Sequence, residues 1–167
     1  MGEIREAAAA DLPAINDIYN HYVLSSTCTY ETQPTSLEAR ERWFAEHASP
    51  WVVTVYEVDG QVVGWASLSQ FRPRAAYAKT VENSVYLHPH WLGKGIGKAL
   101  LVDLVERARA GGFHTMVALI SADQPVSLRL HERLGFAPAG LLREAGHKFG
   151  RWLDVAYWQL ILEKGRA

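Results

Sequence analysis

A segment rich in glycine and lysine lies directly before a helical apolar pattern and has the composition of a phosphate-binding loop. Its residues are Gly93, Lys94, Gly95, Ile96, Gly97 and Lys98. Each glycine weakens a helix by about 1 kcal/mol relative to alanine, so three glycines at a helix start indicate that the backbone must approach a ligand closely. The free first-turn amides and the positive end of the helix dipole favour an anion. We therefore expect this loop to hold a pyrophosphate.

Two common nucleotide-binding patterns do not fit the loop. The Walker pattern requires Ser or Thr after its Gly-Lys pair and a glycine five positions before that pair, whereas this chain has Ala99 and Leu92. The dinucleotide pattern requires a third glycine where this chain has Lys98, and an acid about 20 residues later, where the chain reads TMVALI. A nicotinamide or nucleotide enzyme is therefore disfavoured.

Further polar residues precede the loop. Glu82 is the one acid in the otherwise apolar and small segment TVENSVYL, and its position alone fits a general base or a solvent-facing strand residue equally well. Arg72 and Arg74 flank Pro73, which stiffens the segment, so both guanidinium groups could bind one anion. The alternative is a solvated pair of arginines.

The elements that must position these residues alternate between strands and helices. The patterns predict strands at residues 3–7, 51–58, 61–71, 80–89, 115–121, 136–142 and 151–162. They predict helices after Asp11, from a capping box at Thr35 and Glu38, from the glycine loop to about Ala110, and from Pro125 to Leu134. Strands that first form hairpins and then alternate with helices predict an α/β fold with a mixed sheet.

Composition restricts the class of protein. The 167 residues suit one domain, residues 1–167, and the net charge of −1 argues against a nucleic-acid partner. No run of 18 apolar residues predicts a membrane span. The single cysteine, Cys28, fits a reducing cytoplasm. His88 and His90 have no neighbouring ligands that would complete a zinc site, so we expect no metal.

The glycine loop resembles that of the GNAT-superfamily N-acetyltransferases, whose Gln/Arg-x-x-Gly-x-Gly/Ala signature holds the pyrophosphate of acetyl-CoA. Over nearly the whole chain, the sequence is similar to the phosphinothricin and methionine sulfoximine N-acetyltransferase subfamily. The similar segments are IYNHYVLSSTCTY, TVENSVYL, GKGIGKALL, LRLHERLGFAPAGLLREAGHKFGRW and DVAYWQL. The resemblance implies the GNAT fold, a central and mostly antiparallel sheet with splayed strands flanked by helices.

The resemblance also implies where acetyl-CoA binds. The backbone of Val85, Tyr86 and Leu87 would bind the pantetheine arm as an added strand would, and the glycine loop would bind the pyrophosphate. Gln124 and Ser127 would touch the pantetheine or phosphate end. The chain departs from the family in two places. Leu92 and Gly93 replace a frequent Gln-Arg pair, and Gln124 replaces a frequent asparagine, which we expect to change affinity rather than abolish binding.

By the same resemblance, Glu82 is the base that takes a proton from the acceptor amine, directly or through water. His131, four residues before the Gly-Phe of HERLGF, is the proton donor to the thiolate or a proton relay. The alternative is a histidine that packs near the cofactor. Tyr30 would close over the acceptor, and the weaker candidates for the same pocket are Tyr77, Asn83 and Ser84.

The predicted function is direct transfer of an acetyl group from acetyl-CoA to the α-amine of a small amino-acid-like acceptor. Phosphinothricin, methionine sulfoximine and methionine sulfone are acceptors of this type, and the sequence does not identify the physiological one. One alternative is a GNAT enzyme that acts on a protein N-terminus or another amine, and a second is a non-catalytic acyl-CoA-binding module. The resemblance further implies a homodimer, with Trp152 and Trp158 at the interface.

Overall fold

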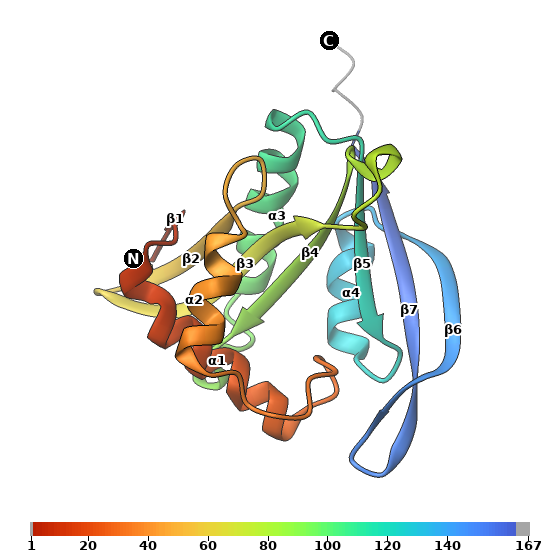
Figure 1. Ribbon diagram of the computed structural model, residues 1–167, viewed down its shortest axis with the longest axis horizontal. Helices are drawn as coiled ribbons and strands as arrows, with labels where there is room; N and C mark the ends of the chain where they lie inside the picture. Colours follow the sequence, from red (N-terminus) through yellow and green to blue (C-terminus); the bar gives the residue numbers. More distant parts are fainter. Residues whose placement is uncertain (1, 163–167) are drawn as a thin grey trace.

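The computed structural model describes residues 2–162, which form one seven-stranded sheet with helices on both faces (Figure 1). The strand order is β1-β2-β3-β4-β5-β7-β6, and every neighbouring pair is antiparallel except β4 and β5. The strands are β1 (Glu3–Glu6), β2 (Val53–Val58), β3 (Gln61–Gln70), β4 (Thr80–Leu87), β5 (Thr115–Ser121), β6 (Ala137–Lys148) and β7 (Arg151–Ile161). The expected mixed and mostly antiparallel sheet is confirmed.

Four α-helices accompany the sheet: α1 (Leu12–Ser25), α2 (Leu37–Ala45), α3 (Ile96–Ala110) and α4 (Pro125–Arg133). The predicted capping box at Thr35 was wrong by one residue. Ser36 is the cap, and its hydroxyl accepts from the Ala39 amide at 3.1 Å. Thr35 instead connects this segment to α1, because its carbonyl accepts hydrogen bonds from the Asn16 and Asn20 side chains.

The last hairpin is longer than predicted. The sequence pattern ended the first of its strands at Leu142, but β6 continues to Lys148 across an irregularity between Leu142 and Gly146. Glu144, at φ 51°, lies in this irregularity, and its amide is bound by the Asp154 carboxylate at 2.8 Å. A bulge of this kind breaks the alternation on which a sequence prediction depends.

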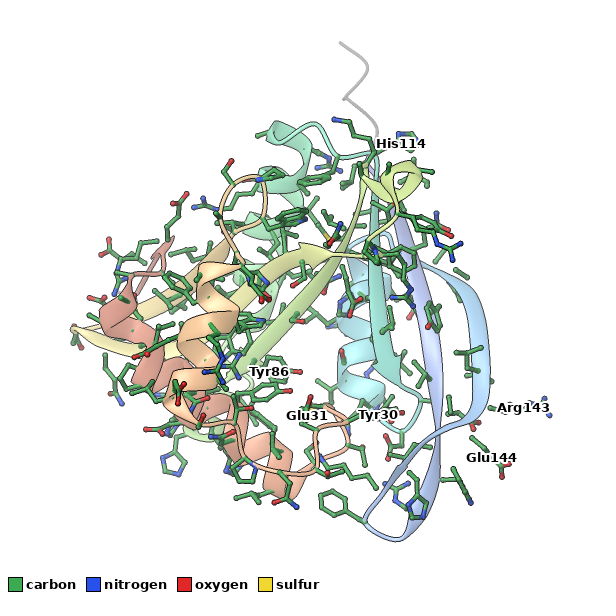
Figure 2. All side chains as sticks on the ribbon, viewed as in Figure 1. Tyr30, Glu31, Tyr86, His114, Arg143 and Glu144 are labelled. Carbon is green, nitrogen blue, oxygen red and sulfur yellow. The ribbon has the colours of Figure 1, made fainter. Side chains whose placement is uncertain are left out.

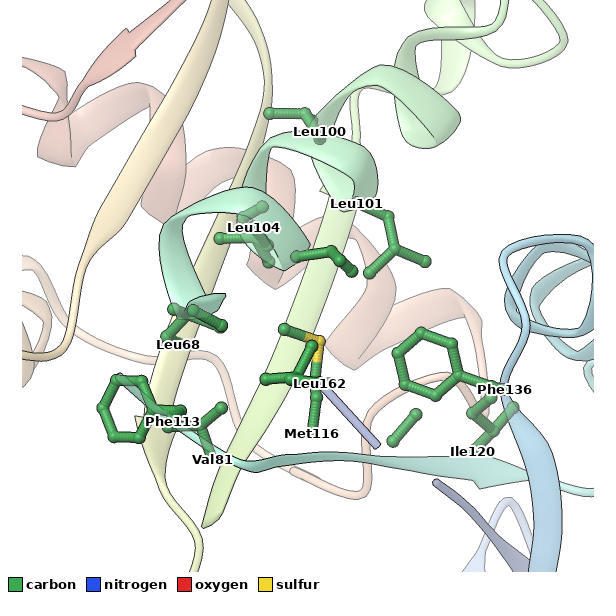
Figure 3. Packing of buried hydrophobic residues seen from close by; sticks show 14 of the residues in the cluster. Leu68, Val81, Leu100, Leu101, Leu104, Phe113, Met116, Ile120, Phe136 and Leu162 are labelled. Atoms are coloured by element: carbon green, nitrogen blue, oxygen red, sulfur yellow. The ribbon is translucent and has the colours of Figure 1, made fainter. Parts of the chain in front are cut away.

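The larger core lies between α3 and the sheet (Figure 3). Leu100, Leu101 and Leu104 of α3 are fully buried against strand residues such as Leu68 and Met116. Burial of each leucine side chain contributes about 1.5–3 kcal/mol. This packing fixes α3 firmly on the sheet, so the glycine loop at its N-terminus has a rigid base.

A second core lies on the opposite face, under α1 and α2 (Figure 1). Its centre is Trp65 of β3, which stacks on Tyr86 of β4 at a ring-centroid distance of 4.9 Å. The buried Arg40 of α2 lies against Tyr19 and Trp43, with its guanidinium carbon 4.5 and 4.6 Å from the two rings. These contacts fix the helices between which the loop carrying Tyr30 runs.

Within residues 2–162, no helix is long and apolar enough to cross a membrane.

Candidate active site

Strands β4 and β5 part along most of their length, and the predicted site residues gather at this opening. The two strands pair only over Thr80–Glu82 and Thr115–Val117, although β4 continues to Leu87 and β5 to Ser121 (Figure 1). Val85, Tyr86 and Leu87 therefore lie where β4 pairs with β3 alone. The facing backbone of β4 has no strand partner there, as a ligand that binds like an added strand requires.

The glycine loop follows β4 and leads into α3. Gly93 and Gly95 have φ angles of 76° and 80°, a conformation that L-residues with side chains adopt at a cost of about 1–2 kcal/mol. Gly95 is the N-cap of α3 and provides no side chain to satisfy the first amides. A Cβ at either glycine would meet nothing within 4 Å, so the surrounding space is open. Backbone amides and open space together suit an anion.

The other loop residues differ in what they contact. Lys94 extends over Trp91, with Nζ 4.2 Å from the ring centroid. Ile96 is buried in the larger core and anchors the first turn of α3. A Cβ at Gly97 would make only ordinary contacts with Leu87 and Leu130, so packing does not require glycine there.

Glu82 lies on β4 at the last position that pairs with β5, where the strands begin to part. Its carboxylate is half-buried, and burial raises its pKa while the charge of Arg72 lowers it. On β3, Ser69 is its partner residue, and Ser84 lies next along the same face of β4, opposite Ser67. A carboxylate with a raised pKa at such a point is suited to accept a proton near neutral pH.

The two arginines have different surroundings. Arg72 is exposed, donates to the Phe71 carbonyl at 2.8 Å, and lies over the Phe71 ring. Arg74 precedes a short 3-10 helix that contains the exposed Tyr77. Pro73 lies between the arginines and is also exposed. The charge of Arg72 lowers the pKa of Glu82.

His131 and Asn83 form a buried pair between α4 and β4. His131 is 5% exposed and Asn83 is 7% exposed. The Nε2 atom of His131 is 3.0 Å from Asn83 Oδ1, and Nδ1 is 2.8 Å from the Ser127 carbonyl oxygen. The Asn83 amide donates to the Val117 carbonyl of β5 at 3.3 Å. Both side chains are therefore engaged within the protein.

The loop between α1 and α2 lies at the open end of β5. Figure 2 shows Tyr30 and Glu31 of this loop between the ends of β4 and β5, with Tyr86 on the β4 side. The Tyr30 hydroxyl is 3.1 Å from Ser121 Oγ at the end of β5 and 3.2 Å from the Asp154 carbonyl oxygen of β7. Its ring packs directly on Gly146, where an added Cβ would be 2.4 Å from the ring.

Other residues fasten the same loop, and the sequence pattern did not single them out. Lys148 of β6 is buried, and its ammonium group donates to the Ser26 and Thr29 carbonyls at 2.7 and 2.8 Å. The Thr27 hydroxyl donates to the Asp123 carboxylate at 2.7 Å. No local pattern marks these contacts, because they join segments about a hundred residues apart.

Gln124 and Ser127 lie at the start of α4. The Gln124 amide donates to the Thr27 hydroxyl at 2.8 Å, so this side chain supports the loop. Ser127 is half-buried and provides the carbonyl that His131 contacts. Both residues lie beside the open end of β5, which precedes α4 directly.

A surface hollow of about 470 Å³ at the end of α2 does not coincide with this site. Phe44, His47, Trp51 and Arg107 are among its lining residues, and none of the predicted site residues borders it. Within it, His47 is already bound to the Trp43 carbonyl and to Ser69 Oγ. The β4–β5 gap is the candidate site, because an unpartnered backbone edge, free helix amides and a half-buried carboxylate lie along it. No group of three or more His, Cys, Asp or Glu side chains gathers within residues 2–162.

Comparison with known proteins identifies similar sequences. A family model described as "Acetyltransferase (GNAT) family" matches residues 15–136. A Pseudomonas aeruginosa protein named L-methionine sulfoximine/L-methionine sulfone acetyltransferase is 42% identical over 166 residues, covering 98% of this chain and 96% of the relative.

Solved structures agree with the sequence comparison. A putative acetyltransferase from Salmonella typhimurium, solved with its cofactor acetyl-CoA, has a TM-score of 0.95 and 40% identity and covers 100% of this chain and 97% of its own. A phosphinothricin acetyltransferase from Sinorhizobium meliloti, in complex with acetyl-CoA, has a TM-score of 0.91 and 44% identity. It covers 96% of this chain and 88% of its own.

Proposed function

The chain belongs to the acetyltransferase (GNAT) family, and from this membership we propose the reaction and the roles of the site residues. The protein transfers the acetyl group of acetyl-CoA to the amine of an amino-acid-like acceptor such as methionine sulfoximine or phosphinothricin. The observation that carries this function is the edge of β4 that faces β5, which is unpaired from Asn83 to Leu87 and ends just before the glycine loop.

Acetyl-CoA fits this arrangement in two places. The amides of the first turn of α3 and the open space at Gly93 and Gly95 suit its pyrophosphate. The exposed β4 backbone from Val85 to Leu87 suits the amide groups of its pantetheine arm. Lys94 and Lys98 add positive charge near the pyrophosphate. With both ends held, the thioester lies along the gap toward Glu82.

Glu82 removes the proton that the acceptor amine must lose. An α-amino group has a pKa of about 7.7–8.0, so part of it is already neutral near pH 7, and a carboxylate base suffices. Burial raises the pKa of Glu82 toward that range. The nitrogen then attacks the thioester carbon, the C–N bond forms, the C–S bond breaks, and the departing sulfur takes up a proton.

The acceptor is held from the side opposite the cofactor. The charge of Arg72 acts on Glu82, and its planar guanidinium group suits the acceptor carboxylate. Arg74 lies two residues further along the chain. Tyr30 closes the pocket from the α1–α2 loop, and Ser84 and Tyr77 are further contacts. A free α-carboxylate distinguishes such an acceptor from the N-terminus of a protein.

We also propose that the protein is a homodimer and acts as a single-domain enzyme in the cytoplasm. The edge strand β6, its neighbour β7 and the turn between them expose several large apolar side chains: Leu141, Leu142, Phe149 and Trp152. Trp152 is 63% exposed, whereas Trp158 packs against the larger core, so Trp152 is the better interface candidate of the two.

A thiol-release assay tests the proposed function. Purified protein and acetyl-CoA are mixed with methionine sulfoximine, methionine sulfone, phosphinothricin, ordinary amino acids and an N-terminal peptide, and free CoA is measured. We expect release with the small acceptors and not with the peptide. Release with the peptide alone would favour a protein-modifying enzyme. Binding of acetyl-CoA in calorimetry, without release for any acceptor, would leave a binding module as the function.

A further inference from the structure

Asn83 and His131 link β4, β5 and α4 at the point where the sheet opens. Asn83 lies one residue after Glu82, and its amide nitrogen donates to the Val117 carbonyl, beyond which β4 and β5 do not pair. Its amide oxygen faces Nε2 of His131, and Nδ1 of His131 faces the Ser127 carbonyl. The contacts form one continuous chain with a backbone carbonyl at each end.

Each contact in this chain needs one hydrogen between its two polar atoms. Both end groups, Val117 O and Ser127 O, only accept hydrogen bonds. With the Asn83 amide donating to Val117, the histidine must donate from both ring nitrogens, and only the imidazolium form can do so. If the amide is turned over, its NH₂ group serves His131, but its oxygen then faces the Val117 oxygen. A neutral His131 therefore leaves one contact of the chain without a hydrogen.

The remaining surroundings of His131 are not charged. Asn83 approaches from β4, the edge of the Phe136 ring lies 5.0 Å away centroid to centroid, and Ser127 O lies on α4 itself. The positive charge of Arg72 acts on Glu82, whose pKa it lowers. Burial lowers the pKa of His131 below its usual value, and the hydrogen bond to the Ser127 carbonyl opposes this shift only in part. The amide oxygen of Asn83 is the remaining polar group that can favour the charged ring.

We propose that Asn83 is a positioning residue that holds His131 in the doubly protonated form, ready to return a proton to the departing thiolate of CoA. This role depends on the proposed acetyl transfer. When the C–S bond breaks, the imidazolium gives one proton to the sulfur and becomes neutral, leaving the chain of contacts one hydrogen short. A proton returns to the ring as Glu82 releases the one it took from the amine. The amine loses one proton, the sulfur gains one, and the enzyme is restored.

Nitrogen-15 NMR of the histidine rings tests the inference without reference to turnover. Although burial lowers the pKa of the ring, we expect both ring nitrogens of His131 to become protonated in the wild-type protein within the range from pH 8.5 down to pH 5.5. A ring that stays neutral between pH 5.5 and pH 8.5, with a bare Nε2, would overturn the proposal.

Two substitutions should move this titration in opposite directions. Asn83→Leu removes the acceptor and should lower the pH at which His131 loses its proton by about one unit, whereas Asn83→Asp adds a negative charge and should raise it by about one unit or more. In Asn83→Leu, kcat should fall about 10- to 100-fold, with the KM for the acceptor within about threefold. The alkaline limb of the kcat profile should move with the NMR titration in both variants.

Asn16→Leu is the matched control. Asn16 is buried to the same extent as Asn83 and binds the Thr35 carbonyl and Arg40, away from the gap. This variant should lose stability but leave the His131 titration and the alkaline limb unchanged. Titration shifts in the Asn83 variants without any movement of the alkaline limb would show a purely structural role and refute the proposal. If the wild-type ring is doubly protonated but no acceptor releases CoA, the proposed function is wrong, whereas the effect of Asn83 on the protonation of His131 is confirmed.

Discussion

The proposed cofactor side and the proposed acceptor side of the β4–β5 gap are built by different means. On the cofactor side, contiguous backbone forms the site: the free edge of β4, two glycines with positive φ, and the first turn of α3. On the acceptor side, side chains from distant segments join the α1–α2 loop to β5, β6 and β7. A site made of backbone suits a cofactor that is the same for every acceptor. Contacts made by side chains can change with the acceptor without disturbing cofactor binding.

Glu82 is shared by both sides, so its replacement should have the largest effect. Glu82→Gln keeps the shape but removes the base, and we expect kcat to fall about 10²- to 10⁴-fold for every acceptor. In the wild-type protein the rate should fall as pH decreases through the pKa of Glu82, because the protonated acid accepts no proton. Burial raises that pKa, so the fall should begin at a higher pH than for an exposed glutamate. Initial rates from pH 5 to pH 9 measure both effects, and a wild-type level of activity in Glu82→Gln would contradict the assigned role.

Gly95→Ala should damage the cofactor side alone. The substitution forces a side chain onto a residue with φ 80° and into the open space that suits the pyrophosphate, so the KM for acetyl-CoA should rise about tenfold. Gly60→Ala is the control, because Gly60 has a φ of 78°, open surroundings and a position in the β2–β3 turn. Both variants should lose similar stability. A tenfold rise in KM for Gly60→Ala as well would mean that backbone strain, and not the loop, causes the effect.

Gly146→Ala should damage the acceptor side alone, with the smallest effect of the three. A Cβ at Gly146 would collide with the Tyr30 ring at 2.4 Å, so the ring must move out of its position over the gap. We expect the KM for the acceptor to rise several-fold while the KM for acetyl-CoA stays within about twofold. Gly140→Ala, on the same strand with nothing within 4 Å of its Cβ, should change neither. Equal changes in both KM values would show that the two sides are not independent.

The same contrast explains what could be predicted from the sequence. Helix α3 and the strands, apart from the second half of β6, were predicted to within about two residues, because local backbone preferences and apolar periodicity determine them. The hydrogen bonds from Lys148 to Ser26 and Thr29 span 122 and 119 residues, and the packing of Gly146 on Tyr30 depends on how two loops meet. Such contacts follow from the tertiary fold, and no spacing rule marks them.

The smaller error at Thr35 has the same cause. Thr35 has the sequence position of a helix cap, but the side chains of α1 bind its carbonyl, and the neighbouring Ser36 caps the helix instead. Asn83 remains a predicted acceptor contact, although its side chain is buried and its amide oxygen faces His131 of α4. Adjacent residues on a strand point to opposite faces, so the sequence alone does not predict which neighbours of Glu82 share its pocket.

A crystal structure of the protein with CoA tests the central claim most directly. The diphosphate should lie within hydrogen-bonding distance of the backbone amides between Gly93 and Lys98, and the pantetheine arm should run along β4 between Val85 and Leu87. The sulfur should then lie at the end of the gap where Glu82 is located. CoA bound away from the β4–β5 gap, or no bound CoA at saturating concentration, would contradict the account.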